Sequence, residues 1–425
     1  MQKLVDIGAR GRVAVASRKM QGLLFVAAIL IGLTAPIAVL GRAAMALTFV
    51  PGFLLLLGWV LRFEATNLWR SARKSSFLRI ILVLTIVAAS FLPFSIDLPR
   101  SAAVLARTSA LVFGAWIVVW VLQREIILAR GAWAGLGSGS AAASVYALAS
   151  IHVIGHPIWP LDPGKPGPEG VALAFKAYSS VAALLAVLFV WRTISASSWP
   201  SRLAWAVNAM LCLAVVVSND ADVSRSALIG IAVAATVALL VPLFGMLPNH
   251  ASRWGASLTV VLVFLCGFFL LCSILAEVVG ENPVPSVLPL GLLDAHRQII
   301  WGFAWNLFME RPLQGWGLDT SNLTPGASNV VPGWNVEFIP AHTHNFVLEL
   351  LVDAGGVLSV LLLAAILFVA LQQIREILRG QSSDLAALLV QAAFWSASFS
   401  NFSIWSFWWL LAFACVLIGA KAVNR

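Results

Sequence analysis

Uncharged apolar runs of about twenty residues recur along most of this sequence, and a run of that length crosses the hydrocarbon core of a bilayer as a helix. Backbone polar groups inside lipid must be hydrogen-bonded within the protein, which leaves helices and closed barrels. Barrel strands alternate in polarity and give much weaker runs. The sequence therefore predicts an all-α, polytopic membrane protein. The composition agrees, because 60% of the residues are hydrophobic and 11% are charged.

We predict about twelve spans from the apolar runs. The first run resembles a signal peptide, but no small-residue cleavage site and soluble domain follow it, so we interpret it as a retained helix. The last two spans share one uncharged stretch, which we divide at residues 398–403. The predicted cores are residues 22–40, 43–61, 78–94, 102–122, 133–153, 171–190, 203–217, 226–246, 256–276, 345–371, 385–399 and 404–420.

The distribution of Lys and Arg predicts the orientation, because cytoplasmic segments carry the excess of positive charge. With a cytoplasmic N-terminus and an even number of spans, both termini are cytoplasmic. Residues 277–343 then form one large outer loop, which is periplasmic in a Gram-negative inner membrane. The predicted organisation is transmembrane helices 1–9 in residues 1–276, the loop domain in 277–343, and helices 10–12 in 344–425.

Eight of the 27 Lys and Arg residues fall on the outer side or at adjacent helix ends, against the usual bias. Arg107, Lys176 and Arg225 lie within or at the edge of predicted spans. A charged residue at the centre of a membrane helix costs at least about 2.5–3.5 kcal/mol. Such residues pair with an acid or with an anionic ligand. The eight outer cations are Arg42, Arg100, Arg107, Lys165, Lys176, Arg225, Arg297 and Arg311.

A short polar run, from Pro340 to Leu348, opens the tenth span and contains His342, His344 and Asn345. A neutral imidazole can take a proton from a sugar hydroxyl near neutral pH. Asn345 could orient that imidazole or a hydroxyl. The structural alternative is that both histidines cap the start of the helix and reach toward water. Together with the neighbouring motifs, we favour a catalytic interpretation.

The second motif, Ser218 to Leu228, connects two spans on the outer face. We expect Arg225 to open the following helix, where its guanidinium would join the positive helix N-terminus and bind phosphate oxygens. An internal ion pair with Asp220 or Asp222 is an equally good interpretation. Asp220 and Asp222 also form a DxD pattern, but nucleotide sugars are not expected outside the cell, so we predict no metal.

The third motif is a predicted helix with Asp294 as its N-cap, ending before Pro312 and followed by a Gly-Trp-Gly turn. We expect an amphipathic helix on the outer surface, packing on the bundle as a lid. Arg297 projects from it as a second candidate phosphate ligand. The apolar positions that form one face are Ile300, Phe303, Ala304, Leu307 and Phe308.

From about residue 200 onward, the order of these motifs resembles the O-antigen ligase and O-antigen polymerase superfamily. The matching elements are Arg225-Ser-Ala-Leu228, the Arg- and Trp-containing helix that ends in Pro312-Leu-Gln-Gly315-Trp-Gly317, and His344-Asn345-Phe-Val-Leu348 with Gly355 after it. The earlier spans match only in being hydrophobic.

The resemblance implies transfer of a glycan from undecaprenyl pyrophosphate to an outer-leaflet acceptor, which is lipid A–core for a ligase. It implies that His344 is the base and that Arg225 and Arg297 complete the catalytic set. His342 has no assured counterpart in the family and is kept as a substrate-binding residue that assists His344. Lys176 and Arg107 would be outer substrate contacts. With no metal or other cofactor expected, guanidinium groups would stabilise the leaving oxygen. Transfer would invert the anomeric centre.

Other functions remain open at this stage. An O-antigen polymerase uses a second polyprenyl-linked repeat as acceptor, and a protein O-oligosaccharyltransferase uses a protein. The single large loop before the histidine motif favours the ligase. A secondary transporter would also have about twelve spans, but it would place ionisable residues near the bilayer midplane and show repeat symmetry. Here they cluster at one face.

Overall fold

The computed structural model describes residues 18–155, 157, 168–247, 250–279, 281, 286–289, 293–380 and 382–422. The regular structure of these residues is helical, apart from one isolated antiparallel bridge between Val330 and Glu337. Nine helices in this part of the chain are long and apolar enough to cross a membrane. The all-α class and the polytopic membrane character are therefore confirmed.

A helix coincides with each of the twelve predicted spans. These helices are α2 (Arg18–Leu33), α3 (Ala44–Trp59), α5 (Ser76–Phe91), α6 (Leu98–Arg124), α7 (Ile126–Ala149), α8 (Pro168–Ser195), α9 (Trp199–Ser218), α10 (Ala221–Gly245), α11 (His250–Val278), α13 (Phe346–Ile377), α14 (Ser382–Ser400) and α15 (Phe407–Lys421). The loop domain, residues 277–343, contains α12 (Ala295–Glu310) and the short 3₁₀ helix η6 (Ser321–Leu323).

Several boundaries differ from the prediction. The first span is shorter, because α2 ends at Leu33 and a 3₁₀ helix, η2 (Pro36–Leu40), follows; proline removes a helical N–H and stops the α-helix. The second span is longer. A π-helix, η3 (Val60–Glu64), joins α3 to the basic helix α4 (Ala65–Lys74). Two further short segments are η4 (Leu92–Phe94) after α5 and the π-helix η5 (Ser150–Ile154) after α7.

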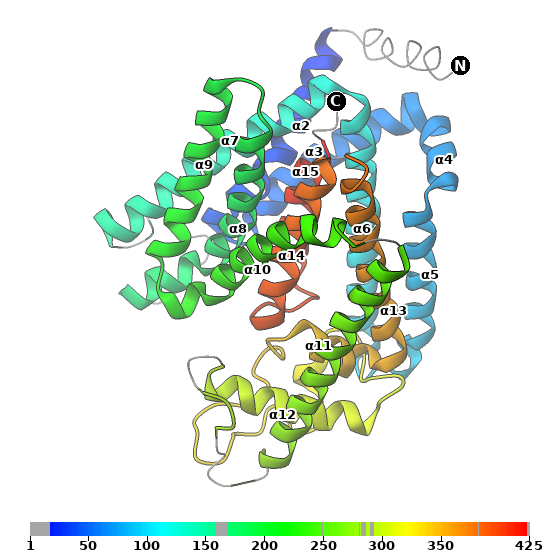
Figure 1. Ribbon diagram of the computed structural model, residues 1–425, viewed down its shortest axis with the longest axis vertical. Coiled ribbons are helices and arrows are strands. Elements are labelled where there is room, and N and C mark those ends of the chain that lie inside the picture. Colours follow the sequence, from blue (N-terminus) through cyan, green and yellow to red (C-terminus); the bar gives the residue numbers. More distant parts are fainter. Residues whose placement is uncertain are drawn as a thin grey trace.

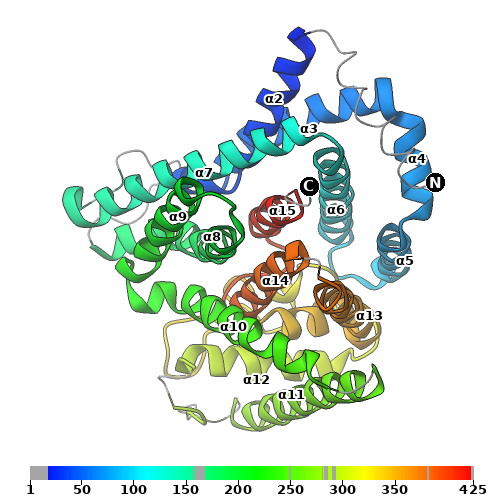
Figure 2. The same ribbon diagram turned by 45° about the horizontal axis from the view of Figure 1, so that its top comes forward.

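The helices form a bundle with α15 at its centre, in contact with α6, α8 and α14 (Figure 2). The start of α2 and the end of α15 lie at one end of the molecule, and α12 lies at the opposite end (Figure 1). The largest buried side chains at the centre include Trp409 and Phe394, whose rings stack with centroids 4.9 Å apart. A second apolar cluster joins α12 to the first turns of α13.

The tenth predicted span is not one continuous helix, since α13 is broken at Gly355, where φ is 68°. The break leaves the carbonyls of Val352 and Asp353 without helical partners. The N–H groups of Trp316 and Gly317 bond to them, each at 2.9 Å. In the other direction, the N–H of Gly356 donates to a carbonyl in the 312–317 segment, that of Pro312, at 2.7 Å. The predicted Gly-Trp-Gly turn therefore completes the hydrogen bonding of a broken membrane helix.

Gly355→Ala should destabilise the fold. A residue with a Cβ at φ of 68° and ψ of 170° costs about 1–3 kcal/mol, and here the Cβ would also meet the Leu313 carbonyl. We expect a clearly lower midpoint of thermal unfolding in detergent. Gly58→Ala is the matched control, because Gly58 is helical and nothing lies within 4 Å of a Cβ there. An equal midpoint for the two variants would contradict this account of the break.

The expectation of a surface-lying amphipathic α12 needs correction. Buried residues are found on more than one face of α12, and its exposed positions are confined to Asn306, Met309 and Glu310. One side packs on α11, where Gly302 lies directly against the backbone of Leu275, and another packs on α13. Side chains of the loop, such as Phe338 stacked on Phe303, cover the rest. The helix is therefore an integral layer of this end of the molecule.

Candidate functional site

The polar run before α13 forms a helix start rather than a flexible loop. Asn345 is fully buried, and its Oδ1 accepts from the N–H groups of Val347 at 3.0 Å and Leu348 at 3.1 Å, as an N-cap does. His344 precedes it in the left-handed region, with φ of 54°. Such a backbone costs a non-glycine residue about 1–3 kcal/mol and persists where the surroundings impose it, commonly at functional sites. The cap is made by Asn345, so neither histidine is needed for it.

The tautomer of His344 follows from one contact. Its Nδ1 lies 2.9 Å from the carbonyl oxygen of Asn401, in the loop between α14 and α15. A carbonyl oxygen only accepts, so Nδ1 carries the proton of the neutral ring. The lone pair is then on Nε2. This is the nitrogen a general base needs to have free of its proton.

His342 has the opposite tautomer. Its Nδ1 accepts from the backbone N–H of His344 at 3.1 Å, which leaves Nε2 as the protonated nitrogen. The two rings lie against each other, with centroids 4.2 Å apart and planes inclined by 48°. The pair therefore presents one acceptor and one donor nitrogen. The acceptor nitrogen suits a hydroxyl group, and the donor nitrogen suits a hydroxyl or phosphoryl oxygen.

Three cations from distant parts of the chain influence the imidazole pair electrostatically. They are Lys176 on α8, Arg297 on α12 and Arg42 in the connection between η2 and α3, and all three act electrostatically on His342. Burial, aided by the charges of His344 and these cations, lowers the pKa of His342. Burial also lowers the pKa of His344 to about 4, with the charge of Arg297 adding to the effect. Both imidazoles are neutral at pH 7.

This pKa predicts an unusual pH profile. A base with pKa about 4 stays deprotonated as the pH falls through the ordinary histidine value of about 6.5. If His344 is the base, kcat/KM of the reaction should therefore hold from about pH 7 to about pH 5 and fall only below that. Arg297→Gln removes a charge that lowers the pKa of His344. When each profile is normalised to its maximum, the acidic fall in rate should therefore occur at higher pH in this variant. An acid limb near pH 6.5 in the unmodified protein would contradict the assignment.

Arg297 is held by its own helix start. Asp294 is the predicted N-cap, and its Oδ1 accepts from the N–H of Arg297 at 2.9 Å. The other carboxylate oxygen of Asp294 lies 3.1 Å from Nε of Arg297. The ion pair fixes the position of the guanidinium through its Nε.

Two serines that flank Arg225 attach the start of α10 to neighbouring elements. Ser224 Oγ bonds to Ser179 Oγ on α8 at 2.9 Å, and Ser226 Oγ accepts from the side-chain amide of Asn401 at 3.0 Å. Since the Asn401 carbonyl bonds to His344, one residue connects the α10 start with the imidazole. The prediction that Arg225 opens the helix was wrong. Helix α10 begins at Ala221, two residues after the Asn219 C-cap of α9, so Arg225 lies in its second turn.

The remaining predicted contacts are placed differently. Arg107 donates to the carbonyl of Trp405 at 3.0 Å and lies 3.4 Å from the Asp319 carboxylate, which also pairs with Arg100 at 3.3 Å. Arg107 thus contacts the end of the α14–α15 loop near Trp405, whereas His344 contacts the end at Asn401. Asp220 is exposed beside the start of α10, and the side chain of Asp222 lies outside the described part of the structure.

Sequence reasoning did not single out two contributors to this site. Arg42 was counted only as an outer cation, although its guanidinium lies 5.0 Å from the Trp408 ring centroid, next to the α14–α15 loop. Asn401 was used only to divide two spans. The available signal was the polar run Ser-Asn-Phe-Ser inside an uncharged and mostly apolar stretch. Polar residues within membrane segments commonly mark functional positions.

Comparison with known proteins gives a consistent result. The family model described as O-antigen ligase matches residues 207–363, which include Arg225, Arg297 and the His344 motif. The resemblance inferred from the motifs is therefore confirmed for this region of the chain.

Two curated relatives carry the printed name "Putative polysaccharide ligase". The protein of Rickettsia conorii strain Malish 7 is 25% identical over 134 residues, and that of Rickettsia bellii strain RML369-C is 25% identical over 136 residues. Each match covers 31% of this chain and 32% of the relative, so the similarity spans about a third of either protein.

Proposed function

Because residues 207–363 match the O-antigen ligase family, we propose that this chain transfers O-antigen polysaccharide from undecaprenyl pyrophosphate to lipid A–core. The observation that carries the proposal is the bond from Nδ1 of His344 to the Asn401 carbonyl, which leaves Nε2 unprotonated on a ring that Arg297 and Lys176 influence electrostatically. Bases and cations of this kind are what a metal-independent transfer from a pyrophosphate donor requires.

The reaction begins when Nε2 of His344 accepts the proton of the acceptor hydroxyl. The hydroxyl oxygen attacks the anomeric carbon, and the bond from that carbon to the pyrophosphate oxygen breaks. Attack opposite the leaving group inverts the anomeric centre. The electron pair of the broken bond stays on the pyrophosphate. The imidazolium then returns its proton to solvent or to the released pyrophosphate.

The developing charge on the leaving oxygen calls for preorganised cations. Arg225 and Arg297 are assigned to the pyrophosphate, since guanidinium can bind two oxygens at once. Lys176 and Arg42 add positive charge to the same region. His342, through its Nε2–H, and Asn345, as the cap that fixes the helix start, complete the set. Arg107, Asp220 and Asp222 are assigned to the edge of the substrate surface, toward the acceptor.

The proposed topology has twelve spans and both termini in the cytoplasm. It is supported by the position of the α2 start and the α15 end at one end of the molecule, with α12 at the other (Figure 1). The histidine run and α12 are then periplasmic, in a bacterial inner membrane. An anionic, membrane-bound acceptor and a lipid-linked donor both approach a site at that face.

The decisive experiment is reconstitution in liposomes with an undecaprenyl-pyrophosphate-linked glycan and purified lipid A–core. A ligase forms the glycan-linked lipid A–core, and omission of either substrate abolishes the product. Longer polyprenyl-linked chains without lipid A–core would indicate a polymerase instead. Glycan on an added protein acceptor would indicate a protein O-oligosaccharyltransferase. Movement of substrate across the bilayer without any new glycosidic bond would indicate a transporter.

The same assay in EDTA tests the metal-independent chemistry. We expect the rate to be unchanged, because guanidinium groups carry the charge stabilisation. A rate that is lost in EDTA and restored by a divalent cation would assign the metal to Asp220 and Asp222.

A further inference from the structure

Two buried carboxyl groups on the first turns of α13 take no part in the proposed chemistry. Glu349 and Asp353 are four residues apart, so they project from the same face of the helix. Both are about 1% exposed. The face that carries them is directed at the loop between α14 and α15, residues 401–406, which we term the 401–406 loop.

The two carboxyl groups bind neighbouring residues in the second half of this loop. Glu349 Oε2 accepts from the backbone N–H of Ile404 at 2.7 Å. Asp353 Oδ2 accepts from the indole Nε1–H of Trp405, also at 2.7 Å. The loop has no regular secondary structure, and these bonds attach it to α13.

The 401–406 loop in turn contacts three groups of the site. The carbonyl of Asn401 accepts from Nδ1 of His344, and its amide donates to Ser226 beside Arg225. The carbonyl of Trp405 accepts from Arg107. A displacement of this loop would therefore remove the carbonyl that fixes the tautomer of His344 and the bond to Ser226 at the start of α10.

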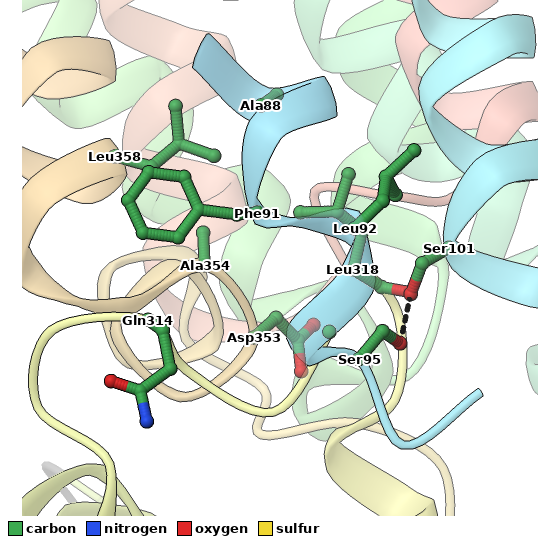
Figure 3. A pocket seen from close by; sticks show the side chains of 11 residues that line it. Ala88, Phe91, Leu92, Ser95, Ser101, Gln314, Leu318, Asp353, Ala354 and Leu358 are labelled. Atoms are coloured by element: carbon green, nitrogen blue, oxygen red, sulfur yellow. Dashed lines mark hydrogen bonds between the residues drawn. The ribbon is translucent and has the colours of Figure 1, made fainter. Parts of the chain in front are cut away.

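Asp353 also fixes the strained turn at Asp319, whose φ is 62°. Oδ2 of Asp353 accepts from the Asp319 N–H at 3.0 Å. The Asp319 carboxylate forms ion pairs with Arg100 and Arg107. Beyond the carboxyl group lies a small cavity that Ser95, Ser101 and Gln314 also line (Figure 3).

Stability alone is a poor reason for this arrangement. Glu349 Oε1 and Asp353 Oδ1 are buried and have no hydrogen-bond partner among the described residues. Buried polar groups left unsatisfied destabilise a fold, and well-packed apolar residues of similar volume usually serve stability better. A requirement for a fixed loop position accounts for two acceptors at these sites.

We propose that Glu349 and Asp353 are positioning residues that hold the 401–406 loop so that the Asn401 carbonyl keeps His344 in its Nδ1–H tautomer. The catalytic part of this inference rests on the proposed function. The tautomer itself does not, since it is measured without substrate.

The test compares Glu349→Leu with Glu349→Gln in nanodiscs. Gln retains an oxygen that accepts from the Ile404 N–H, whereas Leu does not. ¹⁵N-histidine NMR, with the His344 signals assigned by their loss in His344→Ala, should show Nδ1–H in the parent and the Gln variant. In the Leu variant a substantial Nε2–H population should appear. Its kcat should fall by at least about 10²-fold, the lower end of what a positioned base contributes, with KM changed little.

Gln373→Leu is the matched control. Gln373 is a buried polar residue on the same helix, and its Oε1 accepts from Gln391 at 2.7 Å, remote from the loop. Its replacement should leave the tautomer and kcat unchanged. Trp405→Phe provides an independent variant in which the Asp353 contact is lost from the loop side. It should produce the same Nε2–H signal even if Glu349→Leu fails to fold.

A purely Nδ1–H His344 in folded Glu349→Leu, or in Trp405→Phe when the Leu variant does not fold, overturns the proposal. If the parent protein is inactive and the variants nevertheless show the tautomer change, the proposed transfer reaction is refuted and the positioning role remains.

Discussion

His344→Ala should leave the protein folded in the membrane and abolish glycan transfer. The variant lacks the Nε2 lone pair that accepts the hydroxyl proton, and a positioned general base contributes roughly 10²–10⁴-fold to the rate. The fold should persist because the helix start is capped by Asn345 and not by His344. The measurement is the initial rate of product formation by purified protein with both lipid substrates.

His296→Ala is the matched control for that experiment. His296 belongs to the same outer loop domain, and its Nε2 bonds to the Glu337 carbonyl at 2.9 Å, away from the imidazole pair. Its replacement should leave the transfer rate nearly unchanged. Near-normal transfer by purified His344→Ala would remove the base from the mechanism.

Arg225→Ala should have the second largest effect, about 10²–10³-fold on kcat, which is typical of removing one preorganised donor from a developing anion. The neighbouring serines fix the α10 start to α8 and Asn401, so the backbone should stay in place without the guanidinium. Arg225→Lys should recover part of the rate. An ammonium supplies the charge but not the two-pronged contact with phosphate oxygens.

Arg202→Ala serves as the control for loss of a helix-terminal arginine. Arg202 lies at the opposite end of α9 and donates to the Ala196 carbonyl at 2.8 Å. It should change neither kcat nor KM. Equal rates for Arg225→Ala and the unmodified protein would show that Arg297 and Lys176 hold the pyrophosphate without it.

The positions of the helices were predictable because lipid imposes one period and one length on each apolar run. The break at Gly355 was not. Its cause is a set of backbone bonds to Trp316 and Gly317, some forty residues earlier in the chain, and hydropathy contains no information about such contacts. The extent of α12 burial was missed for the same reason, since its covering residues come from α11, α13 and the outer loop.

The candidate site was partly predictable. His342, His344, Lys176 and Arg297 were chosen as polar residues out of place in an apolar chain, and the fold brings them together. Arg42 was overlooked because a cation at a helix end is ordinary on its own. Asn401, Glu349 and Asp353 act through a carbonyl or through buried acceptors. Only the three-dimensional arrangement reveals those roles.

The break in α13 has a consequence for protein engineering. Helix and loop share their hydrogen bonds there, so neither segment carries a complete set of partners by itself. A chimaera that exchanges the loop before α13 between two relatives should succeed only when the crossover points lie outside residues 312–356. Crossovers within that interval would join two halves that did not evolve to fit, and the misassembled product should be recognised by membrane quality-control proteases.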